Sequence, residues 1–214
     1  IKSIGLADSY NLCGALEFSE KISKVGTQPI IGTQINLLTD NILGKVTLYA
    51  TSEEGYKNLT KLSSLSYLQQ GSTNEPHCKI EDIIKNNRDI ILLTGNYNDL
   101  FGKLFFKNKI KHLEKILTSL KIAFKDHLYI EIQRHGEISE KNFENYLLNL
   151  SNTLNIPIIA TQEVFYLDPN MFEAHDALIC IGNKQFLDEK NRLRYNNQHY
   201  LKKNEEIEKI FKDL

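Results

Sequence analysis

Three ionisable side chains lie at or just beyond the ends of apolar runs that are typical of β-strands: Asp8, His135 and Glu163. In α/β folds, chemistry usually takes place just beyond the carboxyl ends of strands. Carboxylates and an imidazole that converge there could hold a divalent metal with an open position for water, as metal-assisted hydrolysis requires. Three groups with one imidazole are few for such a site. The alternative is that Asp8 caps a helix and Glu163 forms a local ion pair.

A second candidate is His175, which stands between Glu173 and Asp176 on a short predicted helix. It could be a metal ligand or a proton shuttle, or an imidazole that packs at the surface or against the helix. The chain has no HExxH motif, no GxSxG elbow, no GxGxxG and no GxxxxGK[ST]. Zinc-protease chemistry, a serine nucleophile and a phosphate-binding loop are therefore not indicated.

A lysine-rich segment could contact nucleic-acid phosphates. It holds Lys103, Lys107, Lys109, Lys111 and Lys115. The alternative is the solvated face of an amphipathic helix. The net charge of −1 gives the whole chain no positive field that would attract nucleic acid.

The composition fits one sizeable globular α/β domain. Of 214 residues, 41% are hydrophobic and 25% are charged. The three cysteines are far apart and form no CxxC pair, which favours a reducing compartment. No apolar run reaches membrane-span length and no signal peptide is evident, so we expect a cytoplasmic protein without a membrane partner.

The strands and helices that position the candidate side chains can be predicted from the spacing of apolar residues. This spacing predicts strands at 4–7, 29–38, 44–51, 89–94, 128–133 and 157–161. It predicts helices at 12–25, 53–65, 80–85, 107–120, 139–154, 171–181 and 205–211, with a loop at 69–78 and an irregular segment at 183–200. This alternation indicates βα units around a mostly parallel sheet or barrel.

Seven segments in order resemble the polymerase-and-histidinol-phosphatase (PHP) domain of the bacterial DNA polymerase III alpha subunit. They read LADSYNLCGALEF (6–18), QPIIG (28–32), SEEGYKNL (52–59), IEIQRHG (130–136), IIAT (158–161), YLD (166–168) and EAHDAL (173–178). The resemblance implies a single domain over 1–214, a distorted seven-stranded, TIM-like β/α barrel that is incomplete at its N-terminus. Segment 183–214 would lead toward a polymerase core, and the first residues read as mid-strand, so we expect upstream sequence.

The resemblance also implies what has happened to the metal site. Metal-binding members carry a Thr-Asp-His motif where this chain has Ala7-Asp8-Ser9, and a glutamate where it has Gln34. Their Asn-Asp-Val-His corresponds to Gln162-Glu163-Val164-Phe165, and His135 is kept. A serine, an amide and a phenyl ring cannot replace the lost ligands. We therefore predict no catalytic residue, no metal and no other cofactor, with these positions vestigial: Asp8, Ser9, Gln34, His135, Glu163 and Phe165.

By this resemblance, the chain is a catalytically degenerate PHP domain that serves DNA replication as a scaffold and subunit-docking module. Its parent would be a DNA-directed DNA polymerase, a nucleotidyltransferase. The implied partners are the rest of the alpha subunit, the proofreading exonuclease subunit as in some members, and DNA through the parent polymerase. The alternative is a phosphoesterase or exonuclease with zinc or manganese on Asp8, His135 and Glu163; a histidinol-phosphatase-like enzyme has less support.

Overall fold

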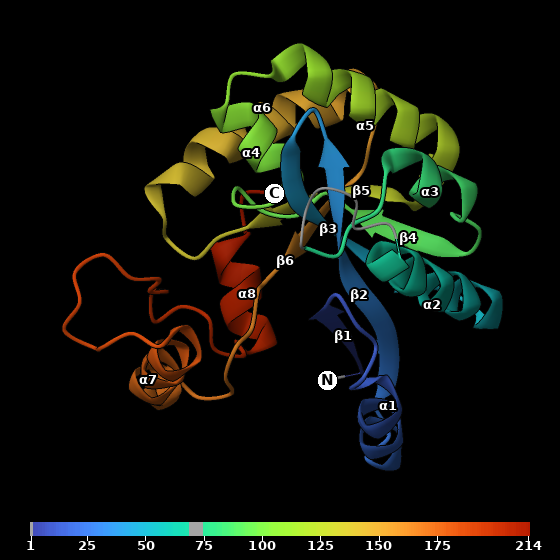
Figure 1. Ribbon diagram of the computed structural model, residues 1–214. Coiled ribbons are helices and arrows are strands. Elements are labelled where there is room, and N and C mark those ends of the chain that lie inside the picture. The colour runs from blue at the N-terminus through green and yellow to red at the C-terminus, as the bar shows by residue number, and fades with distance from the viewer. Residues whose placement is uncertain (1, 69–74) are drawn as a thin grey trace. The chain divides into compact units, whose positions relative to one another are not determined.

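The computed structural model describes residues 2–68 and 75–214 (Figure 1). Most of the loop predicted at 69–78 lies outside the described residues. The strands are β1 (Ser3–Ser9), β2 (Gln28–Thr39), β3 (Ile42–Ala50), β4 (Ile90–Leu93), β5 (Leu128–Gln133) and β6 (Ile158–Thr161). The helices are α1 (Ala15–Lys24), α2 (Glu53–Leu68), α3 (Ile80–Lys85), α4 (Leu100–Phe106), α5 (Ile110–Phe124), α6 (Ile138–Leu154), α7 (Phe172–Asn183) and α8 (Asn204–Ile210), with short 3-10 turns at Lys125–His127 and Pro169–Met171. The expected α/β alternation is confirmed.

The sheet differs from the expected barrel in two ways. Its order is β1-β2-β3-β4-β5-β6, so the described residues supply six strands and the seventh strand of a TIM-like barrel is not confirmed. The β1–β2 and β4–β5 pairs are parallel, whereas β2–β3 and β3–β4 are antiparallel. β3 runs antiparallel to β2 because Asp40 and Asn41, in the turn after β2, both have positive φ and close a two-residue hairpin.

The helices between β4 and β5 also differ from the prediction. The helix expected to start at residue 107 begins at Ile110, because Asn108 adopts a positive φ of 59°. Before it lies α4, which the prediction missed. Asp99 occupies its N-cap position and Leu100 and Leu104 are buried.

The chain divides into two compact units. Unit 1 comprises Ile1–Glu131 and Phe143–Ile159, and unit 2 comprises Ile132–Asn142 and Ala160–Leu214. The divisions fall inside β5, α6 and β6. Among the described residues, no helix combines the length and the apolar composition that crossing a bilayer requires.

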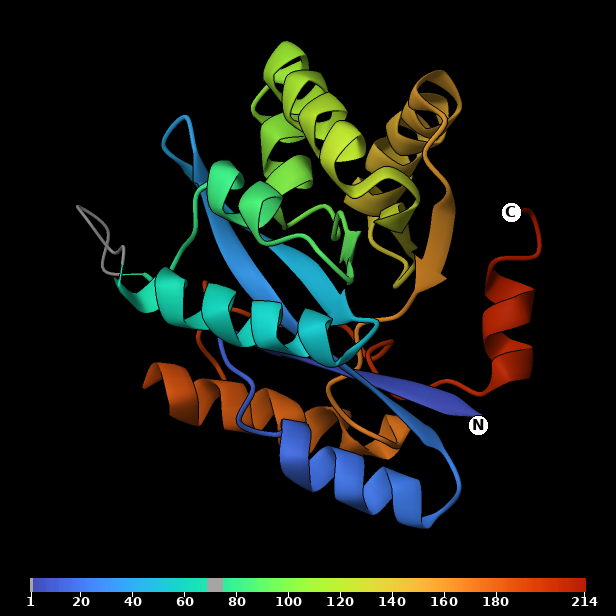
Figure 2. The ribbon, with the colours of Figure 1, turned by 90° about the vertical axis from the view of Figure 1, so that its right-hand side faces the viewer.

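Strand register gives unit 1 one apolar and one polar sheet face. Alternate residues of β2 and β3 form the core, and α2 packs against both strands (Figure 2). These buried residues are Ile35, Leu37, Val46 and Leu48. The opposite face carries Gln34 across from Thr47 and Asn36 across from Lys45. With Ser9, these four residues form what we call the polar face of unit 1.

Unit 2 is built around the turn that precedes α6 and the segment that follows β6. The predicted irregular segment has no helix from 184 to 203, and one bridge, between Tyr166 and Tyr200, fastens it. The Phe165 N–H donates to the His199 carbonyl at 2.9 Å, and the Leu201 N–H donates to the Tyr166 carbonyl at 3.0 Å. These bonds bring His199 beside the segment that holds Glu163 and Phe165.

Candidate functional site

Ser9 and Gln34 meet on the polar face of unit 1, as their register across β1 and β2 requires. The Ser9 hydroxyl donates to Gln34 Oε1 at 2.8 Å. The Lys45 ammonium donates to the same oxygen at 3.0 Å. Lys45 was not among the predicted site residues, because its place opposite β2 depends on the hairpin pairing.

Asp8 lies on the other face of β1. Its neighbour across the sheet is Thr33, and its carboxylate lies so close to Gly14 that a Cβ there would be 2.8 Å from Asp8 Oδ2. Gly14 immediately precedes α1, where a negative charge is favourable. Asp8 therefore does not share a face with Ser9 and Gln34.

The end of β4, at Gly95 and Asn96, carries two buried carboxyl groups that sequence reasoning missed. Asp99 accepts the Asn96 N–H at 3.0 Å, and Glu131 accepts the Gly95 N–H at 3.0 Å. Burial raises the pKa of Asp99, and the positive charge of Lys45 opposes that rise. The signal for Asp99 was available, since an aspartate before an apolar run marks a helix start.

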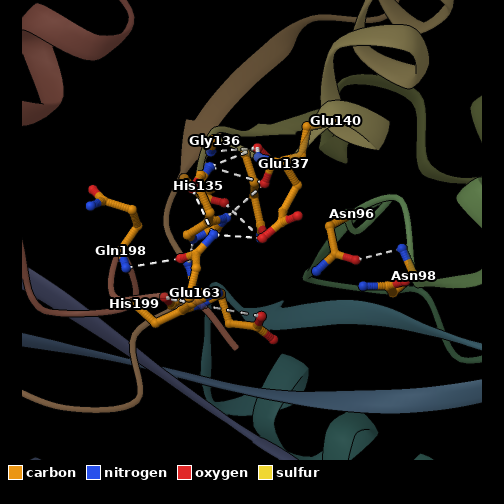
Figure 3. A network of polar contacts seen from close by, with 12 residues as sticks. Asn96, Asn98, His135, Gly136, Glu137, Glu140, Glu163, Gln198 and His199 are labelled. Atoms are coloured by element: carbon orange, nitrogen blue, oxygen red, sulfur yellow. Dashed lines mark hydrogen bonds and ion pairs between the residues drawn. The ribbon is translucent and has the colours of Figure 1, made fainter. Parts of the chain in front are cut away.

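In unit 2, Glu140 closes the turn before α6. Its carboxylate accepts the consecutive backbone N–H groups of His135, Gly136 and Glu137 at 2.8–3.0 Å (Figure 3). Gly136 supplies the positive φ of 86° that this turn requires. Burial acts to raise the pKa of Glu140, but the hydrogen bonds from His135 and Glu137 hold it below its ordinary value.

His135, predicted as a vestigial metal position, uses both of its ring nitrogens. The Glu163 N–H donates to Nε2 at 3.3 Å, so Nε2 is unprotonated and Nδ1 carries the hydrogen, which it donates to Glu140 at 3.0 Å. The ring is buried, with 4% of the residue exposed. The Asn196 amide donates to the His135 carbonyl at 2.9 Å. His135 is therefore engaged through its ring and its backbone.

Phe165 stands within a column of stacked rings. His135 and His199 stack with centroids 4.2 Å apart and planes 6° apart. Phe165 stacks on His199 at 4.9 Å and on His175 at 5.1 Å. Tyr195 packs against Phe165 from the side at 4.6 Å. The phenyl ring thus joins two imidazoles by packing, although it cannot coordinate a metal.

His199, which sequence reasoning passed over, has the most strongly perturbed imidazole of the column. Burial, reinforced by the neighbouring His135, lowers the pKa of His199 to about 4, although its hydrogen bond to Glu163 opposes the shift. That bond joins Nδ1 to the Glu163 carbonyl at 3.2 Å, and the Glu163 carboxylate lies 3.8 Å from the same nitrogen. His199 is therefore neutral at pH 7. The local ion pair considered for Glu163 would require a proton that burial disfavours.

The remaining candidates have structural partners. His175 belongs to the ring column, and its neighbour Asp176 receives both guanidinium nitrogens of Arg192 at 2.6 and 2.7 Å. Those bonds hold the pKa of Asp176 below its ordinary value. In the lysine-rich segment, Lys103 donates to the Leu43 carbonyl at 2.8 Å and Lys109 pairs with Asp40. Two of its five lysines are thus committed to the fold.

These donors do not suit the zinc or manganese ion of the alternative reading. In neither unit do the described residues gather three or more His, Cys, Asp or Glu side chains that could hold a metal ion. Gln34 Oε1 already accepts an ammonium and a hydroxyl, and position 165 offers only carbon. The absence of a metal nevertheless stays a prediction.

In the comparison with known families, residues 1–135 match the PHP domain. The curated relatives include DNA polymerase III subunit alpha of Caulobacter vibrioides (strain NA1000 / CB15N), 35% identical over 218 residues, covering 98% of this chain and 19% of the relative. The same subunit of Rickettsia prowazekii (strain Madrid E) is 34% identical over 210 residues, covering 98% of this chain and 18% of the relative. This chain therefore spans about a fifth of the length of these relatives. Among solved structures, a candidate metal-dependent phosphoesterase from Bifidobacterium adolescentis aligns with a TM-score of 0.49 and 9% identity, covering 76% of this chain and 77% of that one.

Proposed function

Because the chain belongs to the PHP domain family, we propose that it is a catalytically degenerate PHP domain of a DNA polymerase III alpha subunit. Its role is that of a scaffold and subunit-docking module in DNA replication. The parent protein carries the DNA-directed DNA polymerase activity, and the 214 residues themselves perform no chemistry.

The observation that carries this proposal is that both ring nitrogens of His135 have hydrogen-bond partners. A metal ligand must present an unprotonated nitrogen to the ion, but Nε2 accepts the Glu163 N–H and Nδ1 donates to Glu140. Coordination would require the ring to leave one of these partners within a buried turn. Glu140 already receives three backbone N–H groups there, so this turn resists rearrangement.

The docking role is supported by exposed apolar side chains on α7. Leu178 is 63% exposed and Ile181 is 75% exposed, and they stand three residues apart on one side of the helix. Apolar side chains that gather on a surface commonly mark an interaction site. We assign this surface to the remainder of the alpha subunit, since the relatives are about five times as long as this chain.

The proposal is tested by metal analysis of the purified chain after equilibration with zinc or manganese. We expect substoichiometric metal and no hydrolysis of bis(p-nitrophenyl) phosphate. Stoichiometric metal that is lost in H135A but kept in H127A, a variant of an exposed histidine, would overturn it. Nucleotide incorporation on a primed template by the 214-residue chain would equally contradict the assignment.

The alternative, a phosphoesterase or exonuclease built on Asp8, His135 and Glu163, has weaker support. Asp8 lies against Gly14, on the face of β1 opposite Ser9 and Gln34. Both His135 nitrogens have partners. We therefore keep the degenerate domain as the conclusion.

A further inference from the structure

The amide oxygen of Gln34 is the meeting point of two donors. Oε1 accepts the Ser9 hydroxyl at 2.8 Å and the Lys45 ammonium at 3.0 Å. A carbonyl oxygen offers two lone pairs, so these two donors saturate it. One of the two donors is a full positive charge.

The position of this charge is set by the sheet. Lys45 stands across from Asn36, one pair away from Gln34 and Thr47, in the antiparallel ladder of β2 and β3. The strands are joined by the tight turn at Asp40 and Asn41, which fixes their register. The Lys45 side chain therefore leaves the sheet on the same face as Gln34, beside it.

The same charge influences a second group in unit 1. Asp99 is buried, and the charge of Lys45 is the strongest influence that opposes the rise of its pKa, ahead of its hydrogen bond from Asn96. Two polar groups on different elements, Gln34 of β2 and the N-cap of α4, thus share one ammonium as their electrostatic partner.

We propose that the Lys45 ammonium is the resident cation of the polar face of unit 1, and that it keeps divalent metal ions away from this face. A divalent ion bound at Gln34 would have to displace Lys45 or lie within a few ångströms of its like charge. Gln34 suits the resident cation because an amide solvates an ammonium without adding a negative charge that would attract a metal. This inference rests on the proposed function only for the premise that positions 9 and 34 are vestigial metal positions.

Thermal unfolding of four full chains tests the proposal: the parent, Q34E, K45M and Q34E/K45M. With Lys45 present, the new carboxylate gains an ion pair, so Q34E should unfold at or above the parent's Tm. Without Lys45 the carboxylate is unpaired, and Q34E/K45M should have a Tm lower than that of K45M by about 4 °C or more. Millimolar manganese or zinc should then raise the Tm of Q34E/K45M by about 2 °C or more, but should not shift Q34E.

Three outcomes would overturn the proposal. One is that the Gln34→Glu substitution changes the Tm by the same amount in the parent and in K45M. The others are a metal-induced rise in Q34E itself and the absence of any metal-induced rise in Q34E/K45M. If K45M does not fold, the Tm of Q34E with and without metal still tests the inference. A metal-induced rise in that Tm contradicts the inference. A Tm at or above that of the parent, with no metal-induced rise, supports it.

Two controls separate this inference from the proposed function. The exposed Lys107 at the end of α4 serves as the matched site, and Q34E/K107M should behave like Q34E. Stoichiometric metal on the parent chain would contradict the proposed function, yet it would leave the coupling between Lys45 and residue 34 intact.

Discussion

Phe165 has no side-chain atom that can coordinate a metal, but its ring packs against two imidazoles. The family resemblance predicts that this phenyl ring stands at a ligand position and removes coordination there. It could not predict the ring column, because His175 and His199 reach Phe165 only through the fold of α7 and the irregular segment after it. The loss of a ligand at this position thus stays a prediction from the resemblance, whereas the packing is seen only in the tertiary structure.

The column gives a test of this packing role. F165A should lower the free energy of unfolding by about 2 kcal/mol, because it removes a partly buried ring with two stacked neighbours. F165H should cost less, since an imidazole can stack in the same place. Urea unfolding measures both, with L167A as the control because Leu167 is 71% exposed. A loss in F165A no larger than that in L167A would contradict the packing role.

His199 makes the stability of the chain depend on pH. Its pKa of about 4 lies below the ordinary 6.5, so between these values the unfolded chain binds a proton that the folded chain does not. Stability should therefore be unaffected by His199 above pH 6.5 and should fall as the pH drops from 6.5 toward 4. The expected loss between pH 7 and pH 5 is about 2 kcal/mol.

Below the ordinary Glu140 value of 4.5, protonation of that carboxylate adds to the loss, because its folded pKa is lowered. The matched variant is H199F, which keeps an aromatic ring in the column without a proton to bind and should lose less stability between pH 7 and pH 5. NMR of the His199 ring gives the direct measurement. Titration at or above pH 6.5 would show that the site does not disfavour the charged form.

At the scale of elements, periodicity predicts which segments become strands and helices more readily than how they pair. Alternation in residues 29–38 and 44–51 indicated two strands but not their direction. The short connection at Asp40-Asn41 was the missing signal, because two residues can join only antiparallel neighbours. That pairing determines where Lys45 lies, so the same omission hid both the hairpin and this site residue.

The turn before α6 depends on one side chain, and its removal should be costly. E140A leaves three backbone N–H groups and the His135 ring without their acceptor, so we expect the free energy of unfolding to fall by about 3 kcal/mol. E140Q should lose less, since an amide oxygen can replace part of the acceptor. Chemical denaturation compares both with E81A, which removes an exposed glutamate from the first turn of α3. Equal losses in E140A and E81A would contradict this role for Glu140.

At the scale of the whole molecule, the predicted site residues divide between the two units. Ser9 and Gln34 belong to unit 1, whereas His135, Glu163 and Phe165 belong to unit 2. The sequence indicated these positions because strand ends and family motifs are local features. The partners that engage them, Lys45, Glu140 and His199, were not predicted, because each contact depends on strand pairing or on a turn.

The docking surface on α7 can be tested in a full-length alpha subunit that contains this chain. L178D/I181D places two charges on a surface that we assign to the rest of the subunit. We expect the isolated 214-residue chain to keep its Tm within about 2 °C, because both side chains are largely exposed. In the full-length subunit the same charges would be buried without partners, so its first unfolding transition should fall by about 4 °C or more and proteolysis near α7 should accelerate. The control is K190D/N191D, which makes two exposed polar positions of the irregular segment negative. If neither the first unfolding transition nor the proteolysis of the full-length subunit changes, this face of α7 is not covered by the rest of the protein. The docking surface would then have to lie elsewhere on the chain.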